Sequence, residues 1–179
     1  MGSEDFNIYQ CNIKSETLVQ RALKSHNAPI TSVHVHPGSS QSERHGDMSE
    51  LLLSSSMDWT VKIWSPNTRL QPLFSFESSQ EYVYDAQWST THPGVFASCN
   101  GEGIVDIWNI NKDRESPIVH KPIQDKSRPL NSLRWNNDGR RIAVGDSKGY
   151  ISILQVDPEL STPKNEDFDR ITELLQDSN

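Results

Sequence analysis

The sequence predicts an all-β fold that forms part of a β-propeller, and three observations lead to this prediction. Similar segments recur at intervals of 44 and 46 residues along the 179-residue chain. Each recurrence contains short apolar runs of alternating pattern, separated by turn-forming residues, which is typical of antiparallel strands. Four short strands in a repeat of about 40–45 residues are typical of one propeller blade.

Aligning the repeats on their third strands predicts the individual elements. These strands are expected over residues 60–64, 103–108 and 149–154. The second strands are expected over 51–54, 95–98 and 142–145, and the first over 30–36, 82–88 and 130–135. The fourth strands are expected over 71–77 and 117–123. Pro-Gly or Asp-Gly pairs follow each first strand, as turn formers should.

The repeats divide the chain into blade pieces. They are expected over 1–25, 26–77, 78–123 and 124–156, with a separate tail over 157–179. Residues 1–9 resemble residues 144–152, so the chain is expected to begin inside a blade, with residues 17–23 as its outer strand. This amounts to about three and a half blades, whereas closed propellers have 4 to 8. We therefore expect a C-terminal part of a longer protein, or a chain that a partner completes.

Residues 57–64, Met-Asp-Trp-Thr-Val-Lys-Ile-Trp, resemble the WD repeat. A complete WD blade buries a hydrogen-bonded set of His, Ser or Thr, Asp and Trp. Here that set is expected to be His26, Ser54 (or Ser56), Asp58 and Trp64, with a structural role. We expect the surface that binds a partner to lie elsewhere, at residues that the sequence does not identify.

The other blades depart from this set. Glu102 stands where Asp is expected, with Ser79 near the His position, and Lys148 and Leu154 replace Asp and Trp in the last blade. Such variation between units is normal in repeat proteins. Three further carboxylates are isolated in the repeat frame and are expected to serve turns or exposed faces: Asp85, Asp106 and Asp146.

Composition excludes several classes of protein. The net charge of −7 argues against a nucleic-acid surface, and no apolar run is long enough to span a membrane. Two distant cysteines, Cys11 and Cys99, fit a reducing intracellular setting. No cofactor motif, metal site or catalytic constellation is found, so we expect no enzyme. His34 and His36 lack two further zinc ligands and are expected to be half-exposed strand residues.

Two segments outside the strands carry alternatives. The tail over 157–179 has seven acidic and two basic residues and an apolar pattern at helical spacing. It predicts a short amphipathic helix, capped by Asn165, that packs on the propeller or docks on a partner. Its apolar residues are Phe168, Ile171, Leu174 and Leu175. The polar loop over 39–50 is expected to be a surface insertion, or else a contact segment.

A more specific resemblance emerges from several motifs in order. They are Asp-Trp-Thr-Val-Lys-Ile-Trp at 58–64, Tyr-Val-Tyr-Asp at 82–85, His-Pro-Gly-Val-Phe-Ala at 92–97, Asp-Ile-Trp-Asn-Ile-Asn at 106–111 and Ala-Val-Gly-Asp-Ser at 143–147. Together they resemble the dynein intermediate chains, of the cytoplasmic type in particular. The similarity runs from about residue 2 to residue 168.

This resemblance implies a non-catalytic subunit whose WD propeller binds the tail of the dynein heavy chain and supports microtubule-based transport, in the cytoplasm and on the cytoskeleton. Other dynein subunits would be further partners. The family's light-chain and dynactin-binding region has no counterpart in these residues. Two alternatives remain: an axonemal or ciliary dynein intermediate chain, and an unrelated WD-repeat adaptor, since a fold does not determine a function.

Overall fold

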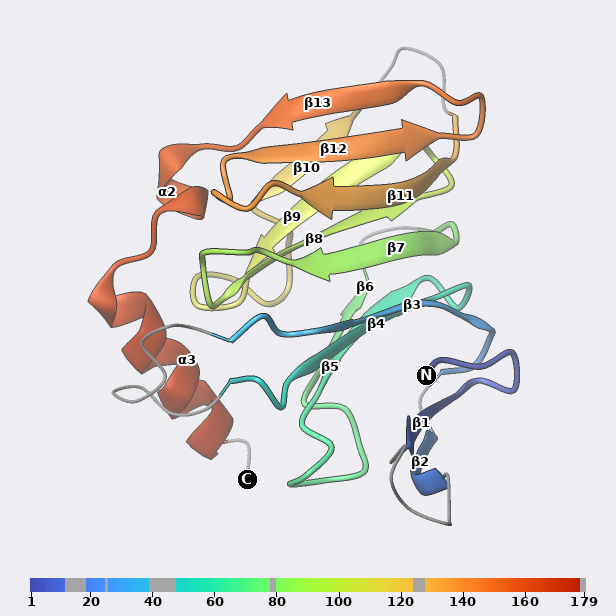
Figure 1. Ribbon diagram of the computed structural model, residues 1–179, viewed down its shortest axis with the longest axis vertical. Coiled ribbons are helices and arrows are strands. Elements are labelled where there is room, and N and C mark those ends of the chain that lie inside the picture. Colours follow the sequence, from blue (N-terminus) through green and yellow to red (C-terminus); the bar gives the residue numbers. More distant parts are fainter. Residues whose placement is uncertain (12–18, 25, 39–47, 78–79, 124–127, 178–179) are drawn as a thin grey trace.

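The computed structural model describes residues 1–11, 19–24, 26–38, 48–77, 80–123 and 128–177. Its strands form four separate antiparallel sheets, which lie one after another along an arc (Figure 1). One sheet has two strands, two sheets have four, and one has three. The predicted partial WD40 propeller of about three and a half blades is thereby confirmed.

The sheets follow chain order. The first sheet pairs β1 (Asn7–Cys11) with β2 (Val19–Lys24). The second contains β3 (Ile30–Val35), β4 (Leu52–Ser56), β5 (Thr60–Trp64) and β6 (Phe74–Glu77). The third contains β7 (Val83–Trp88), β8 (Val95–Asn100), β9 (Ile104–Asn109) and β10 (Val119–Pro122). The last contains β11 (Leu130–Trp135), β12 (Arg141–Asp146) and β13 (Ile151–Gln155).

The first sheet starts with a fragment of a third strand. Gly2 forms an antiparallel bridge with Ile8, and the Tyr9 N–H donates to the Met1 carbonyl oxygen over 2.7 Å. Residues 1–2 therefore pair with β1 as β12 pairs with β13 in the last sheet. β2, the outer strand, is described from Val19 onward, and the first two residues of the strand expected over 17–23 lie outside the described residues.

The innermost strands each carry a register shift near their start. The shifts fall between Ile30 and Ser32, between Val83 and Asp85, and between Leu130 and Ser132. In each case one extra residue bends the strand, which is the effect of a β-bulge. Because the three shifts occur at equivalent positions, the bulge is a repeated feature of the blade.

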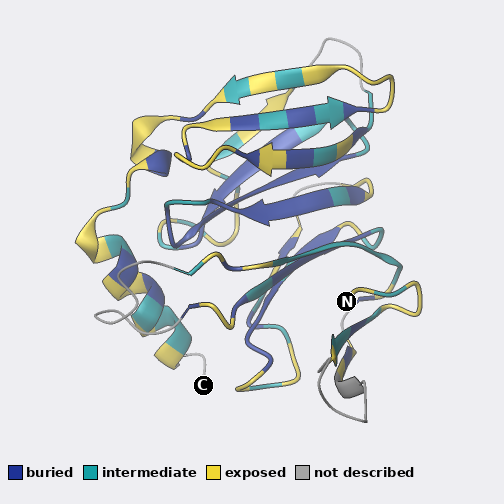
Figure 2. Ribbon diagram, viewed as in Figure 1, coloured by how far each residue is buried: buried dark blue, intermediate teal, exposed yellow. Residues whose placement is uncertain are grey.

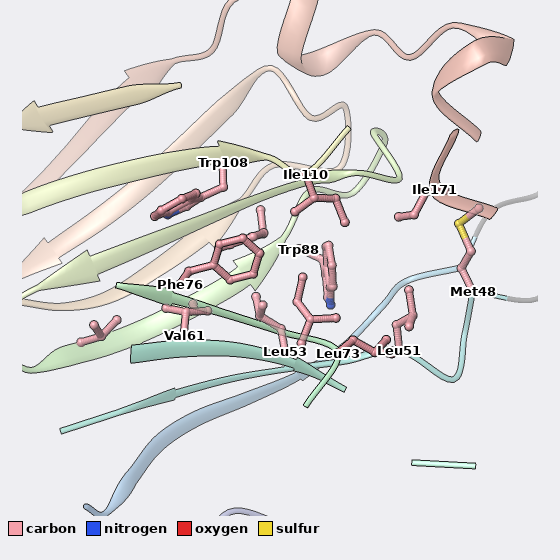
Figure 3. Packing of buried hydrophobic residues seen from close by; sticks show 14 of the residues in the cluster. Met48, Leu51, Leu53, Val61, Leu73, Phe76, Trp88, Trp108, Ile110 and Ile171 are labelled. Carbon is pink, nitrogen blue, oxygen red and sulfur yellow. The ribbon is translucent and has the colours of Figure 1, made fainter. Parts of the chain in front are cut away.

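Apolar side chains fill the space between neighbouring sheets. The largest cluster joins the β3–β6 and β7–β10 sheets and includes Trp88, Phe96 and Trp108 (Figure 3). The Phe96 and Trp108 rings are stacked with centroids 5.9 Å apart. β8 is buried along its whole length, as a central strand covered on both sides should be (Figure 2).

The outer face of the last sheet differs from its counterparts. Val61 and Val105 are buried at equivalent positions in the two preceding blades, whereas Ile151 is 73% exposed. Ile63 and Ile107 are likewise buried, whereas Ile153 is 64% exposed. Figure 2 shows this alternation of exposed and half-buried residues along β13. We call this exposed apolar surface of β13 the open flank.

Two helices follow the last strand and run back across the blades (Figure 1). They are α2 (Pro158–Ser161) and α3 (Asn165–Asp177). Phe168 and Ile171 of α3 enter the largest core cluster, and Leu175 packs against it. Figure 3 shows Ile171 beside Met48, which lies between β3 and β4. The predicted C-terminal helix is therefore confirmed.

The expected cap of this helix is wrong. Asn165 lies inside α3, and the Lys164 N–H instead donates to the Asp167 carboxylate over 2.8 Å. In a capping box, a side chain in the first helical turn accepts the backbone N–H of the residue just before the helix, and the Asp167 carboxylate makes this half of the motif. The Asp157 side chain caps α2 by accepting the Glu159 N–H over 2.9 Å.

Candidate functional site

The four residues predicted as a structural set come from four segments of one blade. His26 precedes β3, Ser54 lies in β4, Asp58 lies in the β4–β5 turn and Trp64 ends β5. Trp64 Nε1 donates to Ser54 Oγ over 2.9 Å, and Ser54 Oγ lies 2.8 Å from His26 Nε2. His26 Nδ1 lies 2.9 Å from Asp58 Oδ2. The structure thus places all four in one hydrogen-bonded chain.

The chemistry of the groups orients this chain. A carboxylate only accepts hydrogen bonds, so His26 Nδ1 carries the proton that is donated to Asp58. In the neutral imidazole, His26 Nε2 then accepts the Ser54 hydroxyl proton. Ser54 Oγ remains free to accept the Trp64 N–H. Every polar atom of the set has a partner, although the His26 side chain is fully buried.

The Asp58 carboxylate also accepts the Asn27 N–H over 2.9 Å and the Thr60 N–H over 3.1 Å. Burial raises the pKa of Asp58, but the hydrogen bonds from His26, Thr60 and Asn27 outweigh it and hold this pKa well below its usual range. Asp58 therefore stays ionised and fixes both the loop before β3 and the turn before β5.

Ser56 has a separate task from Ser54. Its hydroxyl accepts the Asp58 N–H over 3.1 Å and lies 3.0 Å from the carbonyl oxygens of Ala28 and Pro29. Trp59, the next turn residue, has a φ of 73° and is 47% exposed. A left-handed conformation costs a bulky residue about 1–2 kcal/mol, so Trp59 occupies a position that suits glycine.

The same turn recurs in the other blades with different residues. At the position of Ser56, the Asn100 side chain accepts the N–H groups of Glu102 and Ile104, each over 3.1 Å. Asp146 likewise accepts the N–H groups of Lys148 and Tyr150, each over 2.9 Å. The sequence carries this signal, because Ser, Asn and Asp are the side chains that stabilise such turns.

The residues that replace the expected Asp and His in the other blades do not stabilise these turns with their side chains. Glu102 and Lys148 contribute only their backbone N–H groups, and Ser79 lies outside the described residues. The buried indole Nε1 of Trp108 has no hydrogen-bond partner among the described residues. Stacking with Phe96 replaces hydrogen bonding in that blade.

The expectation for Asp85 and Asp106 is wrong, because both are buried. The Asp85 carboxylate accepts the Leu133 N–H over 3.0 Å and the Arg134 Nη1–H over 2.8 Å, both from the next blade. Asp106 lies 2.7 Å from His120 Nδ1 within its own blade. Asp146 does serve a turn, as expected.

The link made by Asp85 also has a counterpart. Ser32 occupies the same bulge position one blade earlier, and its hydroxyl accepts the Ala86 N–H over 3.1 Å. The bulges of β3 and β7 therefore each aim a side chain at the backbone of the following innermost strand, and this joins consecutive blades. Sequence reasoning missed this role because the two partners lie 48 and 54 residues apart.

The C-terminal segment is held by polar contacts as well as by its apolar residues. Thr91 Oγ1 donates to the Ser161 carbonyl oxygen over 2.7 Å, and Asn111 Nδ2 donates to that of Asp167 over 2.8 Å. His92 Nε2 lies 3.5 Å from the Asp167 carboxylate. Burial lowers the pKa of His92 despite the attraction of Asp167. These polar contacts attach the segment to the β7–β10 blade, and its apolar residues enter the cluster shared with the β3–β6 blade.

The histidines considered as metal ligands have structural partners. His36 is buried rather than half-exposed, so that expectation is wrong for this residue. Its Nε2 lies 3.1 Å from the Pro93 carbonyl oxygen, and burial lowers the pKa of His36 to about 4. His34 is half-buried, and its Nδ1 accepts the backbone N–H of Trp88 over 3.3 Å. Over the described ranges, no cluster of three possible metal ligands occurs.

No described helix is long and apolar enough to cross a bilayer.

Comparison with known proteins places these features in a family. A family model described as "Dynein axonemal intermediate chain 3 WD40 domain" matches residues 1–156. The chain is 33% identical over 178 residues to cytoplasmic dynein 1 intermediate chain of Drosophila melanogaster, with 99% of this chain and 26% of that protein covered. It is 28% identical over 170 residues to ciliary dynein intermediate chain 2 of Heliocidaris crassispina, with 92% and 22% covered.

The chain thus spans about a quarter of the length of these curated relatives. The family model nevertheless extends over all four sheets, from β1 to the residue after β13. The chain therefore belongs to the dynein intermediate chain family of WD40 proteins.

Proposed function

We propose that the chain acts as a non-catalytic subunit of a dynein motor complex, with its propeller binding the heavy-chain tail and supporting microtubule-based transport. The observation that carries this proposal is the similarity to dynein intermediate chains over 99% and 92% of the chain. The proposed location is the cytoplasm, in a dynein complex associated with the cytoskeleton.

The architecture suits a binding subunit. The buried polar groups described above have structural partners: Asp58 holds a turn, Asp85 joins two blades and His36 holds a loop. These groups are also buried, so they are not exposed to a substrate in solution. The surfaces that remain are turns, loops and the open flank, which are features that recognise other proteins.

The proposed heavy chain is of the cytoplasmic type. The identity to the cytoplasmic relative is 33%, against 28% to the ciliary one. The ciliary alternative is supported by a different observation, because the matching family model is named for an axonemal chain. A direct comparison of the two kinds of heavy chain therefore decides between them.

The test mixes the tagged 179-residue chain with tail fragments of cytoplasmic and of ciliary dynein heavy chains. Circular dichroism and a thermal melt first establish that the chain is folded. Preferential recovery of the cytoplasmic tail is expected, and preferential recovery of the ciliary tail would support the alternative. A folded chain that recovers neither tail would refute the dynein proposal and leave an unrelated WD adaptor.

A further inference from the structure

One face of the arc is formed by the turns between second and third strands and by the segments that precede the first strands. We call it the turn face, and it comprises residues 3–6, 26–29, 57–59, 80–82, 101–103, 128–129 and 147–150. The helices α2 and α3 lie along the opposite side (Figure 1). Their polar contacts include those with Thr91, His92, Asn111 and Lys112, all of which lie outside the turn face.

Two aromatic residues on the turn face occupy a backbone position that suits glycine. Phe6 and Trp59 have φ values of 71° and 73°, and the equivalent residues of the other two blades are Gly103 and Gly149. Phe6 is 41% exposed and Trp59 is 47% exposed. Burial therefore offsets only part of their strain. Strain that packing does not explain points to a role outside the fold.

The turns that carry the two residues lie next to the same loop, which contains His26 and Asn27. The His26 N–H donates to the Phe6 carbonyl oxygen over 3.1 Å, and the neighbouring Asn27 N–H donates to Asp58 over 2.9 Å. The Phe6 turn and the Trp59 turn therefore flank the same loop. The turn face therefore carries one exposed aromatic residue on each of two neighbouring turns.

Acidic residues accompany these rings. Glu4 and Asp5 directly precede Phe6 and are exposed. In the next blade along the chain, the exposed Glu81 carboxylate lies against Gly101, next to Glu102. This end of the turn face therefore combines aromatic rings with negative charge. Such a surface attracts cationic side chains and repels the phosphates of nucleic acids.

We propose that the turn face binds an arginine- or lysine-bearing segment of a partner protein. The rings of Phe6 and Trp59 receive the cationic groups, and Glu4, Asp5 and Glu81 supply the opposite charge. Arginine fits best, because its planar guanidinium both stacks on a ring and pairs with a carboxylate. The inference goes beyond the proposed function and does not require the partner to be a dynein heavy chain.

The test uses the 179-residue chain and a fluorescently labelled peptide of alternating arginine and glycine, followed by fluorescence anisotropy. The double substitution Phe6→Gly/Trp59→Gly removes both rings where the backbone already suits glycine. We expect its melting temperature to be unchanged or higher and its affinity to fall by about tenfold or more. Wild-type binding is expected to weaken as salt is added.

Two controls make the result specific. Ile153→Ser removes a more exposed apolar side chain from the open flank and should leave the affinity unchanged. A peptide of alternating glutamate and glycine should not bind. Glu4→Gln/Glu81→Gln provides a second test on exposed side chains, and it should also weaken binding. Equal binding of the two peptides, or full affinity in both double variants, would overturn the proposal.

Discussion

Replacing Asp58 by alanine tests whether the buried hydrogen-bonded set of His26, Ser54, Asp58 and Trp64 stabilises its blade. The Asp58 side chain is 6% exposed and accepts hydrogen bonds from His26, Asn27 and Thr60. Asn27 is exposed, so its N–H can turn to water in the variant. The His26 side chain is 0% exposed, so without Asp58 its Nδ1–H loses its 2.9 Å acceptor, gains no water and is left with the longer contact to Thr60 Oγ1 at 3.2 Å.

The expected cost follows from that difference. A buried donor that loses its partner costs about 1–3 kcal/mol. For a domain of this size, 1 kcal/mol lowers the melting temperature by roughly 2–4 °C. Asp58→Ala should therefore lower the melting temperature of the chain by roughly 2–12 °C. Differential scanning calorimetry of the purified chain measures this.

Asp5 offers a matched control. Its carboxylate accepts the Asn7 N–H over 3.3 Å, as Asp58 accepts the Thr60 N–H, but Asp5 is exposed and has no histidine partner. Asp5→Ala should therefore change the melting temperature much less. If the two substitutions had equal effects, or if Asp58→Ala had none, the reasoning from buried donors would be wrong.

The pH dependence adds an independent check. The pKa of Asp58 is lower in the folded chain than its ordinary value of 3.8. Its contribution to stability is therefore present above pH 3.8 and is lost as the pH falls below that value. The difference in melting temperature between the wild type and Asp58→Ala should shrink over the same range. A difference that stays constant would contradict the assigned role of the ionised carboxylate.

Three further predictions concern the helix, a buried histidine and the open flank. Ile171 of α3 is fully buried, so Ile171→Ala should lower the free energy of unfolding by about 2–5 kcal/mol, as measured by a thermal melt. It should also speed proteolysis after α2. Glu173→Ala, at an exposed position of the same helix, should have neither effect. Burial lowers the pKa of His36 from 6.5 to about 4, so up to about 3 kcal/mol of stability present above pH 6.5 should be lost as the pH falls to 4. His36→Gln should weaken that dependence. The isolated chain should associate at high concentration in size-exclusion chromatography, and Ile153→Lys should reduce this; a monomeric wild type would contradict it.

Much of the fold could be predicted because its signals lie between residues close in sequence. The apolar alternation of residues 60–64 and 104–108 identifies strands, and the turn residues between them identify hairpins. The helix pattern of Phe168 and Ile171 similarly indicated a buried face. Local pattern was sufficient wherever the structure depends on neighbours a few residues apart.

The errors arose where a side chain's environment depends on distant parts of the chain. Asp85 was expected at a turn or on an exposed face, yet a bulge in β7 directs it to the backbone of Leu133, 48 residues away. His36 was expected to be half-exposed, yet the loop containing Pro93 covers it. Asn165 was expected to cap the helix from outside, which requires α3 to begin at residue 166. α3 begins at Asn165 itself, so Asn165 is the first helical residue and not the cap.

The set of His26, Ser54, Asp58 and Trp64 shows what the sequence determines and what depends on the tertiary structure. The sequence by itself determined which residue types recur, at what spacing they recur, and which blade contains the complete set. Only the tertiary structure decided that Ser54 rather than Ser56 accepts the Trp64 N–H, since both serines lie in one strand at similar spacing. It also decided that Phe6 and Trp59 flank one loop of the turn face, because that arrangement results from packing consecutive blades together. Spacing along a chain determines local geometry, whereas contact between blades depends on how whole sheets pack.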